Sequence, residues 1–385
     1  MRLLSTMDQT ALDQIRQQIG AAFASAQPST PAELANLPEH VEDEEPHLEF
    51  QLQGRAWTEL DRDFWLQHWP SFRALLPASF RYYLPALLTL CLDEAPGEWN
   101  LVSGTLLILT PSFRRLHDYG RDRRFEYQTS LFNPDQQAAV CSFLGWLLAL
   151  PEWKMRSAQA LKFGWSRIDH EALQQCREFY DSLHHYSRPP IADAEPRALI
   201  ELIQSAFDER AYPGGDQLCG SDYGDEPAEY ALEFKDLDWR TLHPKFLSYH
   251  YAALSFFTDA GFAYYLPAFL IADVLGEGGN ANPVFHLTHG LYEEPPLNLT
   301  SLHPAVLENS SLTAEEVEQL QESIRQTSSI DWHAYALRRF AGITAPERRA
   351  IVAYLEYRAA HIWESEAEKI NAALDSYWRA SLHPG

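Results

Sequence analysis

Apolar residues recur at helical spacing along most of the chain, and the clearest stripes open its two halves. They lie at Leu12, Ile15, Ile19 and Phe23 and at Leu199, Ile203 and Phe207. Three to four apolar residues per two turns on one face are typical of a helix that packs on a core. The same spacing predicts helices at about 61–75, 78–92, 243–257 and 259–274. We therefore expect a mainly helical fold.

Two of these predicted helices contain a proline well inside their span, Pro85 in the first half and Pro267 in the second. An interior proline removes a backbone hydrogen bond and clashes with the carbonyl four residues back, which costs about 3 kcal/mol. We expect the resulting kink to be part of the packing. A kink that opens a ligand groove is the functional alternative, and Tyr264 and Tyr265 beside Pro267 are then candidate binding residues.

Each half continues with a short apolar run, at 105–110 and at 284–288, which we predict to be a strand. A capped helix follows, because Asn133-Pro134 and Thr344 with Glu347 are typical helix starts. A last helix is predicted at about 169–185 and 364–380. The predicted fold class is thus mainly α with a small β component.

One segment of the chain is repeated. Residues 80–86 (FRYYLPA) recur as 262–268 (FAYYLPA), so the numbering of the two copies is offset by 182. Other positions keep the same offset, namely Trp57 and Trp239, Phe64 and Phe246, and His68 and His250. This register predicts a tandem duplication of one helical α+β-type module. The copies are placed at 8–186, diverged, and at 194–382, with a proline-rich connector at 187–193 and a long insertion mostly within 290–340.

Composition and charge narrow the function classes. The four cysteines form no CxxC pair, and the most apolar run, 140–150, is about half of a membrane span, so we expect a cytoplasmic protein without metal, cofactor or membrane contact. The formal net charge is −24, and most of it falls in the second half. Such a field repels nucleic acid and attracts a basic protein partner, although it also serves solubility alone.

The second half resembles an uncharacterised bacterial family, domain of unknown function 6714. The resemblance rests on residues 211–214 (AYPG), 239–242 (WRTL), 262–268 (FAYYLPA), 344–347 (TAPE) and 377–378 (YW). The first half keeps the central block and loses the Tyr-Pro-Gly segment. The resemblance implies a bacterial source and a shared fold, and it implies no activity.

Candidate chemistry gathers in the acidic, glycine-rich loop at 212–229 of the second half. The loop lacks the Lys-Ser or Lys-Thr of a phosphate loop and the spacing of a calcium loop. Its carboxylates are Asp222, Asp225, Glu226 and Glu229. His250 is a candidate general base that would use Asp222, Asp225 or Glu226, and a buried structural histidine is the alternative.

Basic residues crowd one loop of the first half, at Arg114, Arg115, Arg121, Arg123 and Arg124. Asp118 and Asp122 interleave with them and partly neutralise them. The arginines are candidates for gripping phosphate or a carboxylate-rich partner, or for contacting the acidic second half or another copy of the chain.

Two functions remain open. The first is a protein-binding role, in one version an immunity or antitoxin-like protein that neutralises a basic bacterial effector. The second is a hydrolase with a site near His250 and the 212–229 loop. The sequence contains no HExxH or GxSxG motif and no Cys-His nucleophile arrangement, which favours the binding role.

Overall fold

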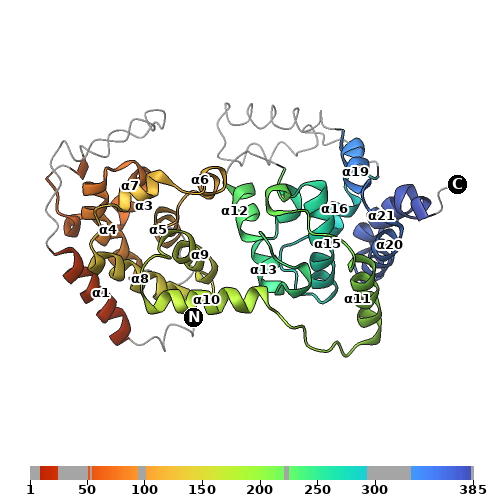
Figure 1. Cartoon of the computed structure of the whole chain (residues 1–385), viewed down its shortest axis with the longest axis horizontal. Coiled ribbons are helices and arrows are strands. Elements are labelled where there is room, and N and C mark those ends of the chain that lie inside the picture. Colours follow the sequence, from red (N-terminus) through yellow and green to blue (C-terminus); the bar gives the residue numbers. More distant parts are fainter. Residues whose placement is uncertain are drawn as a thin grey trace, which may run out of the picture. The chain divides into compact units, whose positions relative to one another are not determined.

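The structure is a computed structural model, and it describes residues 9–24, 51–52, 54–93, 101–220, 225–292 and 331–382 (Figure 1). Helices dominate these ranges, and within them the β component is limited to an isolated antiparallel bridge between Cys219 and Phe257. The chain divides into two compact units. The first contains residues 1–182 with 224–229, and the second contains residues 183–223 with 230–385.

The first unit is built around α4, whose residues are buried along almost its whole length. Helix α4 packs against α1, α5 and α7, and α8 packs against α1. The elements in order are α1 (Gln9–Phe23), η4 (Trp57–Glu59), α3 (Arg62–His68), η5 (Pro70–Ala74), α4 (Pro77–Cys91), α5 (Leu101–Leu109), α6 (Phe113–Tyr119), α7 (Arg123–Thr129), α8 (Pro134–Leu148), α9 (Lys154–Gln159) and the π-turn η6 (Ala160–Gly164). Helix α10 (Glu171–His184) follows.

The second unit is built around α15, which is buried on nearly every side. It packs against α11, α13, α16, α19 and α20. The elements in order are α11 (Ala194–Phe207), η7 (Gly215–Gln217), α12 (Glu226–Glu233), η8 (Trp239–Thr241), α13 (Pro244–Tyr249), α14 (Ala253–Phe256), α15 (Asp259–Val274), α16 (Pro283–Thr288), α19 (Trp332–Phe340), α20 (Ala345–Ala360), α21 (Glu364–Ala373), the π-turn η10 (Leu374–Trp378) and η11 (Ala380–Leu382).

The two central helices are held by the same kind of tyrosine contact. In α4 the Tyr83 hydroxyl donates to the carbonyl oxygens of Leu52 at 2.8 Å and Arg55 at 3.1 Å. In α15 the Tyr265 hydroxyl donates to the carbonyl oxygens of Phe234 at 2.6 Å and Leu237 at 3.0 Å. Each member of the second set follows its counterpart at the offset of the repeated segment.

Each unit contains a tryptophan beside a π-turn whose indole N–H is hydrogen-bonded. The indole N–H of Trp165, directly after η6, donates to the carbonyl oxygen of Leu109 at 3.0 Å. That of Trp378, at the end of η10, donates to the carbonyl oxygen of Leu287 at 2.8 Å. Each bond joins the π-turn region to a helix of the same unit, α5 in the first unit and α16 in the second.

The two predicted strands are wrong, because both segments are helical. Residues 105–110 belong to α5 and its end, and a uniformly apolar run cannot be told from a buried helix by periodicity. The Thr110 hydroxyl donates to the carbonyl oxygen of Leu106, four residues back, at 2.7 Å, as helical backbone allows. Residues 284–288 belong to α16, which begins with an Asn282 cap and Pro283, the same signal that correctly predicted α8.

The paired tryptophans of the repeat differ in burial. Trp239 is 2% exposed, as expected of a core anchor, whereas Trp57 is only half-buried. The two interior prolines lie inside continuous helices as predicted, at Pro85 in α4 and Pro267 in α15. Most of the predicted insertion falls on residues 293–330 and lies outside the described residues.

Candidate functional site

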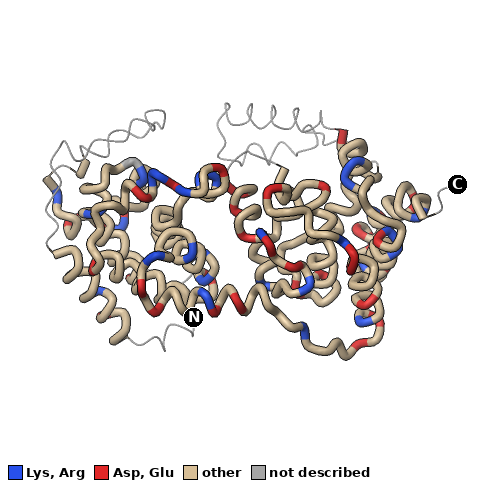
Figure 2. Tube along the Cα trace, viewed as in Figure 1, with Lys and Arg blue, Asp and Glu red and all other residues tan. Residues whose placement is uncertain are grey.

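The arginine-rich segment of the first unit folds into two short helices, α6 and α7. Gly120 separates them at a φ of 66°, a left-handed conformation that glycine adopts without strain. Ser112 caps α6 by accepting the backbone N–H of Arg115 at 3.3 Å, and Asp122 caps α7. Basic and acidic positions are mixed along this stretch of the trace (Figure 2). The capped turn therefore fixes the backbone positions of the arginines on α6 and α7.

The Asp122 carboxylate holds this turn together. Its Oδ1 accepts the backbone N–H groups of Arg124 at 3.0 Å and Phe125 at 3.2 Å, and its Oδ2 accepts that of Ser112 at 2.9 Å. Arg115 Nη1 also donates to Oδ1 at 3.3 Å. The Asp122 side chain is 6% exposed. Asp122 is thus a structural anion whose acceptor sites are largely used.

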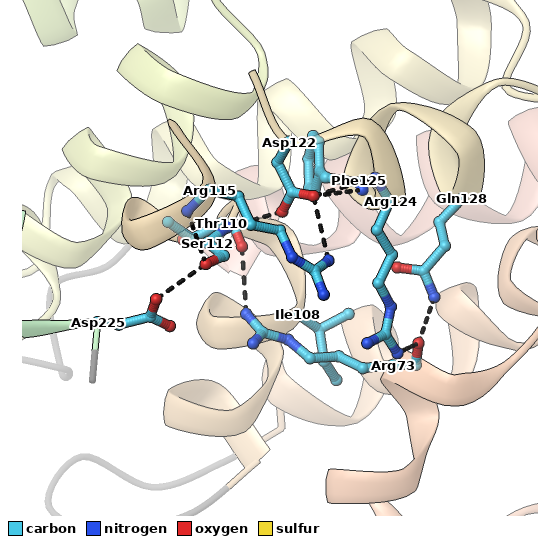
Figure 3. Close-up of a pocket in the computed structure, with 10 residues that line it drawn as sticks. All are labelled: Arg73, Ile108, Thr110, Ser112, Arg115, Asp122, Arg124, Phe125, Gln128 and Asp225. Atoms are coloured by element: carbon cyan, nitrogen blue, oxygen red, sulfur yellow. Dashed lines mark hydrogen bonds and ion pairs between the residues drawn. The ribbon is translucent and has the colours of Figure 1, made fainter. Parts of the chain in front are cut away.

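A cavity of about 220 Å³ lies beside Asp122 in the first unit (Figure 3). Its charged lining consists of Arg73, Arg115, Arg124, Asp122 and Asp225. Clefts for drug-sized ligands measure about 300–1,000 Å³, so this cavity has room for a small group.

The three guanidinium groups reach the cavity from three elements, η5, α6 and α7. Arg73 Nη2 donates to the carbonyl oxygens of Thr110 at 3.2 Å and of Leu107. Arg124 Nη2 donates to the carbonyl oxygen of Arg73, which also accepts Nε2 of Gln128. An arginine has five N–H donors, so the observed bonds of Arg73 and Arg115 use only part of their capacity.

Burial sets the electrostatics of Arg73. Burial lowers the pKa of its guanidinium, the carboxylates of Asp225 and Asp122 raise it, and the nearby Arg115 lowers it again. Arginine stays protonated at neutral pH in spite of such shifts. An anion in the cavity would replace the water that Arg73 loses on burial, and its negative charge would offset the repulsion between Arg73 and Arg115.

Asp225 completes the lining from a distant part of the sequence. It directly precedes α12, and residues 224–229 belong to the first unit. Its Oδ1 accepts the Ser112 hydroxyl at 2.8 Å and the backbone N–H of Arg114 at 3.2 Å. Asp225 is a predicted carboxylate of the acidic loop, and the structure brings it to the arginine-rich turn.

The other predicted arginines lie outside the cavity. Arg114 pairs with Asp118 at 3.7 Å, Arg121 pairs with Glu126, and Arg123 is exposed. Two of the five predicted arginines, Arg115 and Arg124, therefore line the cavity. Arg73 was missed because it lies far ahead of the turn in the sequence, and nothing near it indicates a site.

The histidine proposed as a general base is enclosed by aromatic rings. His250 is fully buried at the end of α13, and its ring centroid lies 4.5 Å from Phe246, 4.9 Å from Tyr249, 5.3 Å from Phe234 and 5.6 Å from Tyr230. This surrounding is that of a core histidine, since a general base must reach its substrate within hydrogen-bond distance.

The remaining candidate residues of the second half lie in different surroundings. Tyr264 and Tyr265 are buried, and burial raises the pKa of both hydroxyls. Glu229 accepts Nε2 of Gln159 at 2.7 Å, and Glu226 is exposed. Asp222 lies outside the described residues. The two tyrosines therefore pack in the core beside Pro267.

Metal ligands and membrane-spanning helices are two further features of interest. Among the residues that the structure describes, no three His, Cys, Asp or Glu side chains are grouped closely enough to hold a metal ion. Within the same ranges no helix has both the length and the apolar character needed to cross a bilayer.

Comparison with known proteins gives a family and no activity. A family model described as a family of unknown function (DUF6714) matches residues 11–175 and 196–283, about two thirds of the chain. The chain belongs to this family. The DUF6714 match covers most of the first half, which the sequence analysis regarded as diverged, and it ends in the second half at the start of α16. No curated protein and no solved structure matches the chain.

Proposed function

We propose that this DUF6714 protein is a binding protein and that the arginine cavity of its first unit recognises an anionic group. The observation that carries the proposal is the convergence of three guanidinium groups on one cavity of about 220 Å³. Guanidinium groups recognise carboxylate and phosphate by charge-assisted hydrogen bonds. The nearest buried carboxylate, Asp122, is occupied by backbone N–H groups and Arg115, so it does not neutralise the whole cluster.

We propose further that the two units are copies of one helical module. The tyrosine bonds of α4 and α15 support this, because donors and acceptors all share the offset of 182. The bonds of Thr110 to Leu106 and of Thr288 to Val284 add a pair at an offset of 178. On this proposal the copies correspond up to η6 and η10, and α10 is additional to the first copy.

The hydrolase alternative has less support. Its candidate base, His250, lies among aromatic rings, and its candidate partners Asp225 and Glu226 lie on the exposed start of α12. A reaction centre would need an accessible base within reach of a substrate. We therefore favour binding over catalysis, with neither metal nor cofactor.

The nature of the partner is also revised. A basic protein would bind the acidic loop, yet Asp225 and Glu229 of that loop already accept hydrogen bonds from the first unit. The arginine cavity instead favours an acidic ligand, and the same chemistry disfavours a basic effector of the immunity or antitoxin type. The four free cysteines, three of them buried, suit a reducing bacterial cytoplasm.

Thermal unfolding with added anion tests the binding proposal. Acetate and sulfate should stabilise the protein at constant ionic strength, by about 1.4 kcal/mol at ten times the Kd. Arg115→Gln should abolish this stabilisation, because the Arg115 side chain lines the cavity and is 35% exposed, so its loss need not unfold the turn.

Arg114→Gln is the matched control, since Arg114 is the sequence neighbour, carries the same charge and lies outside the cavity lining. Equal anion effects in the two variants would show that the stabilisation comes from general charge and would refute the cavity. Constant ionic strength is essential because screening alone changes the stability of an acidic protein.

A further inference from the structure

Asp225, at the rim of the cavity, accepts fewer hydrogen bonds than Asp122. Both hydrogen bonds of Asp225 reach one oxygen, Oδ1, from the Ser112 hydroxyl and the backbone N–H of Arg114. The Asp225 residue is exposed, whereas Asp122 is buried under four N–H donors. Figure 3 shows the Asp225 carboxylate at the edge of the space into which the arginine side chains extend.

The formal charges of the lining decide which anions fit. Arg73, Arg115 and Arg124 contribute three positive charges, and Asp122 and Asp225 contribute two negative ones, so the cavity carries a surplus of one positive charge. A singly charged anion neutralises this surplus. A doubly charged anion leaves an excess negative charge beside Asp225, and the two negative charges repel each other.

We propose that the cavity selects a monocarboxylate over a dianion, and that Asp225 is the residue that determines this selectivity. This inference rests on the proposed function, since it names the ligand class of the same site. The carboxylate can belong to a free small acid or to the C-terminus of a peptide, because the cavity of about 220 Å³ accepts only a small charged group. Arginine pairs with both in the same two-pronged geometry.

Asp225→Asn tests the inference with the least structural change. Asparagine keeps an oxygen that can accept from Ser112 and from the Arg114 N–H, while the negative charge is lost. Coulomb energy is proportional to ligand charge, so the gain in affinity for a dianion is the square of that for a monoanion. We expect about threefold tighter acetate and about tenfold tighter sulfate binding.

The measurement is the Kd of acetate and of sulfate, each from thermal stabilisation at constant ionic strength, for wild type, Asp225→Asn and Glu226→Gln. Glu226 is the adjacent carboxylate and is not part of the cavity lining, so Glu226→Gln should leave the ratio of the two Kd values unchanged. A second arm measures the Kd of an N-acetylated dipeptide acid and compares it with the Kd of acetate, with the dipeptide amide as the uncharged control. A lower Kd for the dipeptide acid than for acetate identifies a chain end as the ligand, and equal Kd values identify a free acid.

The outcomes separate this inference from the proposed function. If both anions bind through Arg115 and Asp225→Asn changes their affinities by equal factors, or Glu226→Gln shifts their ratio as much, the selectivity proposal is overturned and the binding site stands. If sulfate binds wild type more tightly than acetate, the selectivity proposal also fails. If neither anion stabilises any variant, the proposed function itself is wrong.

Discussion

Arginine side chains have different surroundings in the cavity region of the first unit and in the region of the second unit that lies at the offsets of the repeated segment. In the first, Gln128 of α7 donates to the carbonyl oxygen of Leu75 ahead of α4, and the arginines stand around a cavity. In the second, Arg339 of α19 donates to the carbonyl oxygen of Phe257 ahead of α15, at 3.3 Å. Leu75 and Phe257 share the offset of 182, and Gln128 and Arg339 share the offset of 211 found between the helix starts at 133 and 344.

Arg339 of the second unit is enclosed by bonding partners and by an aromatic ring. It is 4% exposed, bonds to the hydroxyl of Tyr335 and lies 4.2 Å from the ring centroid of Phe262. A cation whose Nη groups already bond to carbonyls and a hydroxyl, and which lies over an aromatic ring, has fewer donors to offer a ligand. Burial of the whole side chain, at 4% exposure, also keeps a ligand from reaching Arg339.

A second contrast between the units concerns the contact of α15 with α20 in the second unit. There the Tyr354 hydroxyl donates to Oδ2 of Asp273, and Arg358 Nε lies 3.1 Å from the same carboxylate. At the same two offsets, 182 for α15 and 211 for α20, the first unit has apolar or weakly polar side chains, namely Cys91, Phe143 and Leu147. The second unit thus holds a polar network, whereas the first-unit residues at these offsets are buried and apolar or weakly polar.

The largest expected effect tests whether the two units share one framework. Trp165→Ala and Trp378→Ala should each lower the free energy of unfolding by about 3–5 kcal/mol, because both remove a buried indole and its hydrogen bond. Guanidinium unfolding followed by circular dichroism measures the losses. If only one substitution is strongly destabilising, the tryptophans do not hold equivalent positions.

A smaller effect is expected at the polar network of the second unit. Asp273→Ala should cost about 2–3 kcal/mol, because the buried Tyr354 hydroxyl and Arg358 lose their shared acceptor. Importing the first unit's residues, as the triple variant D273C/Y354F/R358L, should recover most of this loss, since well-packed apolar groups replace buried polar ones at little cost. A triple variant no more stable than Asp273→Ala would show that the two sites pack differently.

Much of the framework could be predicted from the sequence, and the site could be predicted only in part. The helix over 78–92 and the start at Asn133 follow from apolar spacing and capping chemistry, which are local. The segment 105–110 was mispredicted as a strand because its residues are almost all apolar, exposed Leu107 included, so the sequence carries no helical periodicity there. Gly104 lets the Trp69 ring approach to 2.6 Å of where a Cβ would be.

The cavity could not be assembled from local signals. The arginine cluster pointed to Arg115 and Arg124, while Arg73 and Asp225 arrive from segments that the fold alone brings together. Their contacts use backbone carbonyl and N–H groups, which leave no trace in the sequence pattern. Conversely His250, prominent because the repeat retains it, is a core residue. The repeated His68 and His250 pattern thus pointed to a packed residue, and the cavity residues Arg115 and Arg124 lie outside the segments that keep the offset of 182.

The smallest predicted effect concerns pH and contrasts His286 with Ile108, the first-unit residue at the offset of 178. Burial, Arg339 and His289 lower the pKa of His286 to about 4, below its value near 6.5 in an unfolded chain. Between pH 4 and 6.5 the unfolded state therefore binds more protons, so this histidine contributes stability above pH 6.5 that is lost as pH falls toward 4.

We expect His286 to contribute about 1–2 kcal/mol to the free energy of unfolding, because the half-buried ring retains some solvent screening. His286→Ile, which imports the first-unit residue, should flatten the stability profile in that window, whereas His185→Ile, at an exposed histidine, should leave it unchanged. Urea unfolding at half-unit pH steps measures the free energy of unfolding as a function of pH. Equal slopes of this profile for wild type and His286→Ile would mean that the pKa of His286 is the same in the folded and the unfolded chain, which contradicts the prediction.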